Sequence, residues 1–122
     1  MIRSDYFMRQ LAQFIQTIIN FLLKRDIPVS SEEEEKYLNS GFKILGVDKD
    51  KILTMSVENI IDSVSEKGAS LEEIEAIAYL LLLEQQIHAI SHKDTVKKLL
   101  FYVEEQSKVY SVDRRAIIES LS

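Results

Sequence analysis

Apolar and polar residues follow one another along this 122-residue chain with the spacing of helices rather than strands. In segment after segment, apolar side chains recur every three or four positions, which places them on one face of a helix. Short polar breaks with candidate capping residues separate the segments. The pattern predicts an all-α fold of five to six helices, at about residues 4–25, 32–45, 57–67, 71–89, 92–110 and 113–121, with a short helical turn at 48–55.

The long N-terminal helix has an unusually wide apolar surface. Its apolar side chains cover an arc of roughly 200° at about 100° per residue, against the ~100° of an ordinary surface helix. One neighbouring helix cannot cover such an arc. Phe7, Phe14 and Phe21 form a row along one edge, beside Gln10 and Thr17. We expect the centre of the arc to pack within the chain. We expect the Phe row to pack against a second surface, which is either a helix of the same chain or another chain.

The opposite face of the same helix is polar but carries little charge. Its side chains are mostly uncharged amides, with a charged residue near each end: Arg9, Gln10, Gln13, Gln16, Thr17, Asn20 and Lys24. A helix that lies on a lipid surface usually carries several Lys and Arg on its polar face. The pattern therefore argues against a membrane role and favours contact with protein.

The segment AIAYLLLL, residues 76–83, is apolar on every side of a helix. Such a helix is expected to be enclosed by its neighbours. Eight residues are too few to cross a bilayer, which takes about 20. Serines with acidic residues three positions later indicate helix starts. The candidate pairs are Ser31 with Glu34, Ser70 with Glu73, and Ser91 with Asp94, while Gly46 is a candidate C-terminal cap.

Composition agrees with the helical pattern. Three glycines and one proline leave little material for hairpins or phosphate-binding loops, and 122 residues suit one domain, 1–122. The absence of cysteine excludes disulfides and thiolate chemistry and suits a reducing compartment, so a cytoplasmic location is expected. A net charge of −5 argues against general affinity for nucleic acid or anionic lipid.

The side chains that carry most enzyme chemistry have structural explanations here. His88 and His92 are four residues apart, but the predicted break between two helices separates them, so we expect a solvent-exposed pair and no metal site. Carboxylates fall mainly at helix starts and on polar faces, and serines mainly at capping positions. No catalytic residue, metal site or cofactor is predicted, and the chain is not expected to be an enzyme.

Two further groups of residues suggest partners only weakly. The basic pairs Lys97 with Lys98 and Arg114 with Arg115 are too isolated for a DNA-reading helix, so no nucleic acid is expected. Tyrosines lie at or beside the apolar stripes, where such rings usually pack their bodies and hydrogen-bond their tips. They are Tyr6, Tyr79, Tyr102 and Tyr110. Core-edge packing is favoured over a ligand-lined groove.

Several short motifs resemble a family of small bacterial proteins of unknown function, whose members begin D-Y-x-M-R-x-I/L. The motifs are SDYFMRQL, LGVDKDKI with SVENII, IEAIAYLLLLEQQ, VKKLLFYVEE and SVDRRAIIESL. The resemblance implies an all-helical fold with a tetratricopeptide-like helical pair at about 71–110, and it implies no activity. This pair is longer than the 34-residue repeat and lacks its Trp and Pro.

The sequence favours a non-enzymatic protein-interaction or self-association module, with a homodimer as one form. The predicted partner-binding residues are Phe7, Gln10, Phe14, Thr17 and Phe21. One alternative is a small-molecule-binding or enzymatic domain with a site between helices, near Tyr79 and Tyr102. A regulator associated with nucleic acid is a weaker alternative.

Overall fold

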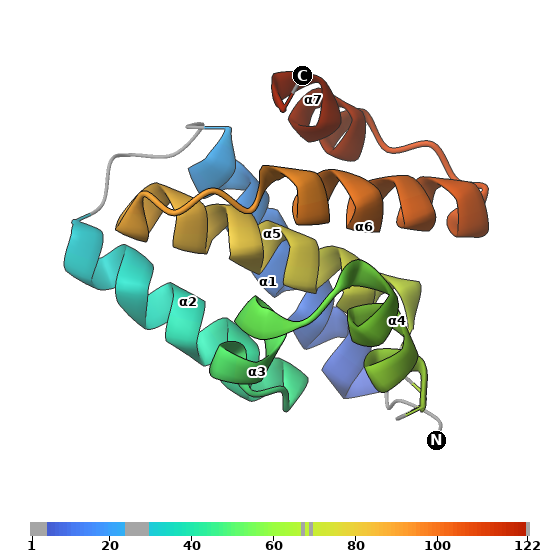
Figure 1. Cartoon of the computed structure of the whole chain (residues 1–122), viewed down its shortest axis with the longest axis horizontal. Coiled ribbons are helices and arrows are strands. Elements are labelled where there is room, and N and C mark those ends of the chain that lie inside the picture. Colours follow the sequence, from blue (N-terminus) through green and yellow to red (C-terminus); the bar gives the residue numbers. More distant parts are fainter. Residues whose placement is uncertain (1–4, 24–29, 67, 69, 122) are drawn as a thin grey trace.

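The computed structural model describes residues 5–23, 30–66, 68 and 70–121. These residues form seven helices and no strand (Figure 1), so the predicted all-α class is confirmed. The helices are α1 (Asp5–Leu22), α2 (Ser31–Leu45), α3 (Lys49–Thr54), α4 (Val57–Glu66), α5 (Leu71–His88), α6 (Lys93–Ser107) and α7 (Val112–Ser120). The count exceeds six because the turn expected at 48–55 forms the short helix α3. Residues 4, 24, 25 and 67, also predicted to be helical, lie outside the described residues.

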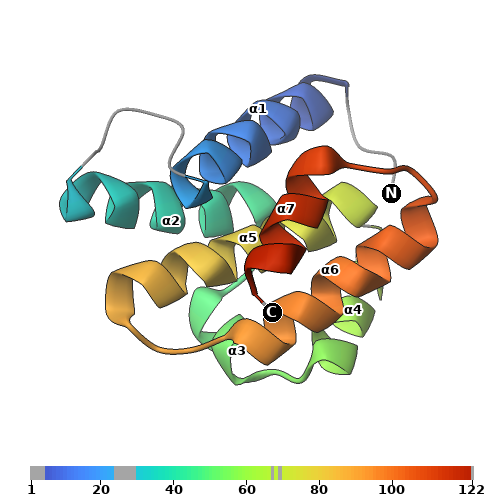
Figure 2. The ribbon, with the colours of Figure 1, turned by 90° about the horizontal axis from the view of Figure 1, so that it is seen from above.

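Helix α5 lies at the centre of the fold, with α1, α2 and α6 packed around it (Figure 1 and Figure 2). All of its residues 76–83 are buried, as expected for a helix that is apolar on every side. Helix α6 runs antiparallel to α5 and beside it, so the two form a helical pair. Its likeness to a tetratricopeptide pair stays a prediction. Among the described residues, none of the helices is both long and apolar enough to pass through a bilayer.

Two helices cover the wide apolar arc of α1. Leu11 and Ile18, at the centre of the arc, are fully buried, and α1 packs along α5. Helix α2 covers the edge, where the rings of Phe14 and Tyr37 stack with their centroids 5.4 Å apart. The arc is wide because this helix has two neighbours within its own chain.

Gly41 of α2 permits this close approach. A Cβ atom placed on Gly41 would lie 2.5 Å from Cζ of Phe14 and 2.6 Å from Cδ2 of Leu80. Distances this short do not occur between carbon atoms in a packed core, so any larger residue here would push neighbouring side chains or helices apart. Glycine inside a helix costs about 1 kcal/mol relative to alanine. Close packing of α1, α2 and α5 explains why the position is glycine.

One predicted helix end and one predicted helix start are confirmed. Gly46 ends α2 in the left-handed conformation, with φ of 68°, and its N–H donates to the carbonyl of Lys43. Ser70 precedes α5, and its backbone N–H donates to the Glu73 carboxylate at 2.8 Å, as a capping box requires.

Two predicted helix starts were each wrong by one residue. The hydroxyl of Ser30, rather than Ser31, accepts the N–H of Glu33 at the start of α2. Helix α6 begins at Lys93 after the cap residue His92, rather than in a box formed by Ser91. Adjacent serines carry the same local capping signal, so spacing alone does not select between them.

Helices α5 and α6 both end on left-handed residues that are not glycine. Ala89 has φ of 57° and Lys108 has φ of 56°. The N–H of Ala89 donates to the Gln85 carbonyl at 2.9 Å, and the Gln85 side chain accepts the N–H of His92 at 2.7 Å. These bonds fix the short connection from α5 to α6.

Candidate functional site

Two residues of the predicted Phe row, Phe14 and Phe21, contact α2. Phe14 is buried and stacks on Tyr37, and Phe21 meets the same ring edge-on with the centroids 5.2 Å apart. Phe7 is half-buried and packs against the core. The chain's own helix α2 therefore contacts Phe14 and Phe21. Whether this edge of α1 also meets another chain stays a prediction.

Three of the five predicted partner-binding residues share one groove. Gln10, Phe14 and Thr17 line a groove of about 260 Å³ between α1 and α2, together with Gln13, Tyr37 and Ile44. Phe7 and Phe21 do not line it. The groove has an aromatic floor and an amide rim without charged groups.

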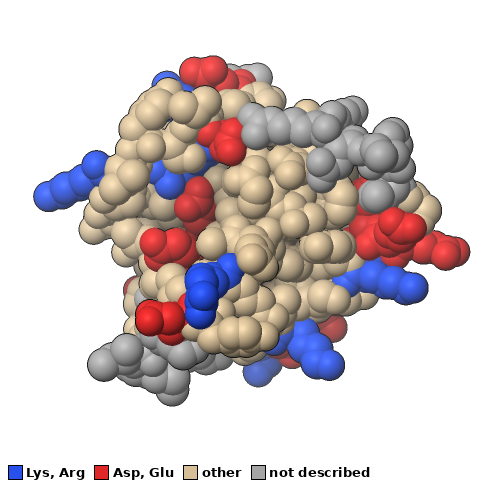
Figure 3. Space-filling view, turned by 180° about the vertical axis from the view of Figure 1, so that it is seen from behind, with Lys and Arg blue, Asp and Glu red and all other residues tan. Residues whose placement is uncertain are grey.

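Beyond Arg9, the solvent side of α1 is polar and uncharged. Residues 10–23 contain no Lys, Arg, Asp or Glu. We call Ala12, Gln13, Gln16 and Asn20 the amide face; the first three are exposed and Asn20 is half-buried. Seen from behind the view of Figure 1, on the side where α1 lies, the molecule has a broad area free of charged side chains (Figure 3). Such an area suits contact with another protein surface better than contact with an ion or a phosphate.

Local hydrogen bonds order part of the amide face. The Gln16 amide nitrogen donates to the Asn20 side-chain oxygen at 3.1 Å, and the Thr17 hydroxyl donates to the Gln13 carbonyl at 3.0 Å. Each amide can donate two hydrogen bonds and accept two, so the Gln16–Asn20 bond uses a fraction of their capacity.

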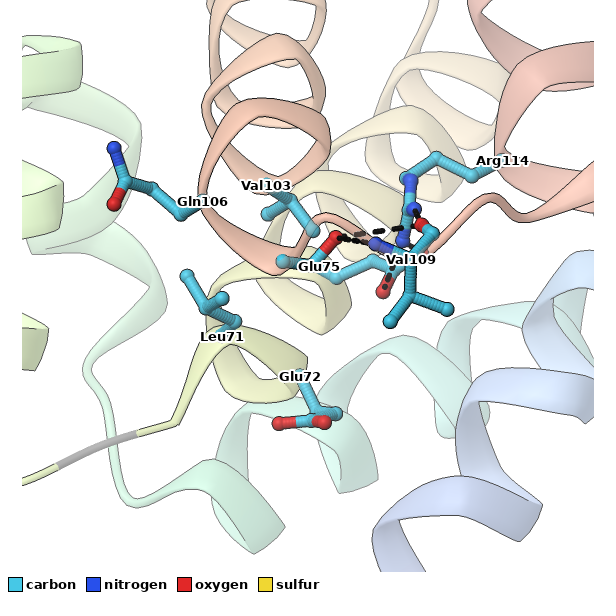
Figure 4. Close-up of a pocket in the computed structure, with 8 residues that line it drawn as sticks. Leu71, Glu72, Glu75, Val103, Gln106, Val109 and Arg114 are labelled. Atoms are coloured by element: carbon cyan, nitrogen blue, oxygen red, sulfur yellow. Dashed lines mark hydrogen bonds and ion pairs between the residues drawn. The ribbon is translucent and has the colours of Figure 1, made fainter.

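A charged cluster lies inside the fold, where α5, α6 and α7 meet. The Arg114 side chain of α7 is 5% exposed, and its Nε donates to Glu104 of α6 at 2.5 Å. Its Nη1 lies 3.4 Å from both carboxylate oxygens of Glu75 on α5, and its Nη2 donates to the Val109 carbonyl. Figure 4 shows Arg114 directed toward Glu75 and Val109. One guanidinium therefore ties three helices and the α6–α7 connection together.

The charges around Arg114 outweigh the effect of its burial. Burial alone would lower the pKa of Arg114, but the hydrogen bond that Arg114 donates to Glu104 and the charges of Glu75 and Glu104 raise it above its ordinary value. The sequence grouped Arg114 with Arg115 as a compact basic pair. In the fold the two differ, because Arg115 is exposed whereas Arg114 is buried with partners that lie 10 and 39 residues away in the chain.

Tyr79 completes this cluster. Its side chain is fully buried, and its hydroxyl donates to Glu75 at 2.5 Å. Burial, then the neighbouring Glu75 carboxylate, raises the pKa of Tyr79 far above its ordinary value of 10.0. The expectation of a packed ring with a hydrogen-bonded tip is confirmed for Tyr79. It was wrong for Tyr6 and Tyr110, which are 72% and 70% exposed.

A cavity of about 360 Å³ adjoins this cluster, lined by Leu71, Glu72, Glu75, Val103, Val109 and Arg114 among others. Tyr102, which the sequence paired with Tyr79 in the alternative ligand site, is not one of the lining residues. Glu75 and Arg114 already bind each other. Their polar groups are engaged in holding the helices rather than directed at the open space.

Another buried carboxylate lies farther along α5. The Glu84 side chain is 6% exposed, and its Oε2 lies 3.2 Å from Nζ of Lys49 in the short helix α3. The same oxygen is 3.7 Å from Nε2 of His88, which is 3.3 Å from Glu35 of α2. The sequence assigned carboxylates mainly to polar faces; Glu75 and Glu84 are exceptions because each has a basic partner from another helix.

The histidines differ from each other in their surroundings. His88 closes α5 and His92 precedes α6, so the predicted break between them is confirmed. The expected exposure was wrong for His92, which is half-buried with its Nε2 shielded from solvent and without a hydrogen-bond partner. Among the described residues, no group of three or more His, Cys, Asp or Glu side chains is arranged to hold a metal ion.

No protein-family model, curated protein or solved structure matches this chain. The resemblance based on short motifs therefore stays a hypothesis.

Proposed function

We propose that this protein is a non-enzymatic interaction module that binds a protein partner through α1. The contact surface consists of the amide face and the adjoining α1–α2 groove. The observation that carries the proposal is the 14-residue stretch 10–23 without a charged residue, part of which faces solvent. Polar but uncharged side chains lose less on desolvation than charged ones, and charge is depleted at the centre of protein interfaces.

The geometry of the groove adds to this support. Gln10, Gln13 and Thr17 stand beside the aromatic pair Phe14 and Tyr37. Aromatic rings next to hydrogen-bonding side chains are typical of interface centres. An interaction role also agrees with the charged clusters, which bind their own helices together. The alternative of a small-molecule site has weaker support, because Glu75 and Arg114 at that cavity already pair with each other.

Site-specific photocrosslinking tests the proposal. A benzophenone amino acid replaces Gln16 on the amide face or, as the matched control, Gln106, an exposed glutamine of α6. Irradiation of the cells that express the chain is expected to give a discrete adduct from position 16 and none from position 106. Adding Gln13→Lys should remove the adduct. No adduct at position 16, or equal adducts at both positions, would contradict the proposal.

A further inference from the structure

We propose that the partner of the amide face is a second copy of this chain. In the pair, the two α1 helices pack antiparallel about a twofold axis, with Gln13 of one copy facing Gln16 of the other. This inference rests on the proposed function and names its partner.

Charge restricts which surface can meet its own copy. A twofold interface places each surface patch against the same patch of the second chain. With a net charge of −5, two copies repel each other, and acidic patches such as exposed Glu32 and Glu33 would repel most at close range. The amide face contains no charge, so it can be brought against itself without this penalty.

Amide side chains are also complementary to themselves. A carboxylate only accepts hydrogen bonds and an ammonium only donates them, whereas each Gln or Asn amide does both. Gln13 and Gln16 are one helical turn apart and both are exposed. In an antiparallel pair with these residues opposed, each amide meets another amide with matching donors and acceptors.

The charged residue next to the amide face selects the direction of packing. Arg9 is exposed, one turn before Gln13. A parallel pair would set Arg9 beside Arg9 of the second copy and align the two helix dipoles unfavourably. In the antiparallel register, Arg9 lies opposite Asn20 of the second copy, near the negative end of that helix.

The area of the amide face determines how tightly the two copies are expected to bind. An 18-residue helix is about 27 Å long and presents a strip about 10 Å wide, on the order of 300 Å² for each copy. Stable interfaces bury about 800 Å² on each side. We therefore expect a weak, reversible dimer that forms in the micromolar range and above.

Sedimentation velocity over a range of concentrations tests the pairing. The wild-type 14.1 kDa chain is expected to shift toward twice its mass as concentration rises. Gln13→Lys and Gln16→Glu should each weaken association at least tenfold, because each places like charges close to the twofold axis. The matched control Gln106→Lys should associate like the wild type. Unchanged thermal unfolding midpoints would show that all three variants fold.

A charge exchange separates antiparallel packing from other arrangements. Mixing Gln13→Lys with Gln16→Glu should restore dimers, because position 13 of one copy faces position 16 of the other. The cysteine-free chain allows a second check with Gln13→Cys and Gln16→Cys. Oxidation of their mixture should favour the disulfide between the two variants over the two symmetric ones, since disulfides need Cα atoms within about 7 Å. Preferential symmetric disulfides would overturn the antiparallel register.

The crosslinking result distinguishes failure of this inference from failure of the proposed function. An adduct from position 16 with twice the mass of the chain supports the second copy. An adduct of any other mass, together with a wild-type chain that stays monomeric, contradicts self-association but leaves the interaction function standing. A monomeric chain without an adduct contradicts both.

Discussion

Helices α1 and α5 place their polar side chains in opposite environments. The solvent face of α1 carries uncharged amides, whereas α5 holds the charged Glu75 and Glu84 mostly inside the fold. Glu75 and Glu84 each have a basic partner from another helix. We infer that the polar groups of α5 serve the stability of the fold, while those of α1 are available for contact outside it. Mutations on the two helices should therefore be visible in different measurements.

The largest expected effect is at the interior cluster. Arg114→Ala would leave Glu75 and Glu104 facing each other without a cation. Breaking a buried ion pair on one side typically costs about 3–5 kcal/mol, and urea denaturation should show a loss of this size. The control is Arg115→Ala, because Arg115 is exposed and pairs with exposed Glu119 at 3.4 Å. An exposed pair contributes about 0–1 kcal/mol. Equal losses for the two variants would refute a structural role for the cluster.

The next largest effect is expected where α1 and α2 touch. In Gly41→Ala, the new methyl group would clash with Phe14 and Leu80. Overpacking of this kind costs about 1–3 kcal/mol, against a gain of about 1 kcal/mol from the better helix propensity of alanine. Urea denaturation should show a net loss of stability. Ser40→Ala, at the exposed neighbouring position, should not destabilise the chain. Adding Phe14→Leu to Gly41→Ala should recover part of the loss.

The smallest expected effect is the contribution of Tyr79 to the pH dependence of stability. Its folded-state pKa is raised, so above about pH 10 the unfolded chain loses this proton while the folded chain retains it. Stability contributed by the protonated hydroxyl is complete below pH 10 and falls above it by about 1.4 kcal/mol per pH unit. Urea denaturation between pH 9 and 11 should show a shallower decline for Tyr79→Phe than for the wild type. Tyr110→Phe, at a 70% exposed position, should leave the slope unchanged.

The sequence predicted the features that depend on nearby residues. The apolar segment 76–83 identified the buried helix, Gly46 marked the end of α2, and Ser70 with Glu73 marked the start of α5. Each of these signals acts within one or two helical turns. The predicted edge of α1 at Phe14 also lies under a second helix, because an arc of that width requires two neighbours.

What the sequence did not predict depends on partners far along the chain. Arg114 was grouped with its neighbour Arg115, yet its guanidinium contacts Glu75, 39 residues earlier. No spacing in the sequence paired Glu84 with Lys49 of α3, which stabilises it in the interior. A charged side chain is stable in the interior only where the fold brings partner groups to it. Helical periodicity does not indicate which distant residues those partners are.

The caps at Ala89 and Lys108 have a consequence for how this protein can change. Both take a left-handed conformation that suits glycine and strains other residues by about 1 kcal/mol. Natural proteins sit only a little above the stability they need, so such unoptimised positions persist. Glycine at either site would release backbone strain without altering a core contact. Glycine at the end of α5 or α6 is therefore expected to raise the free energy of unfolding. Such a gain would offset the loss caused by a destabilising mutation elsewhere.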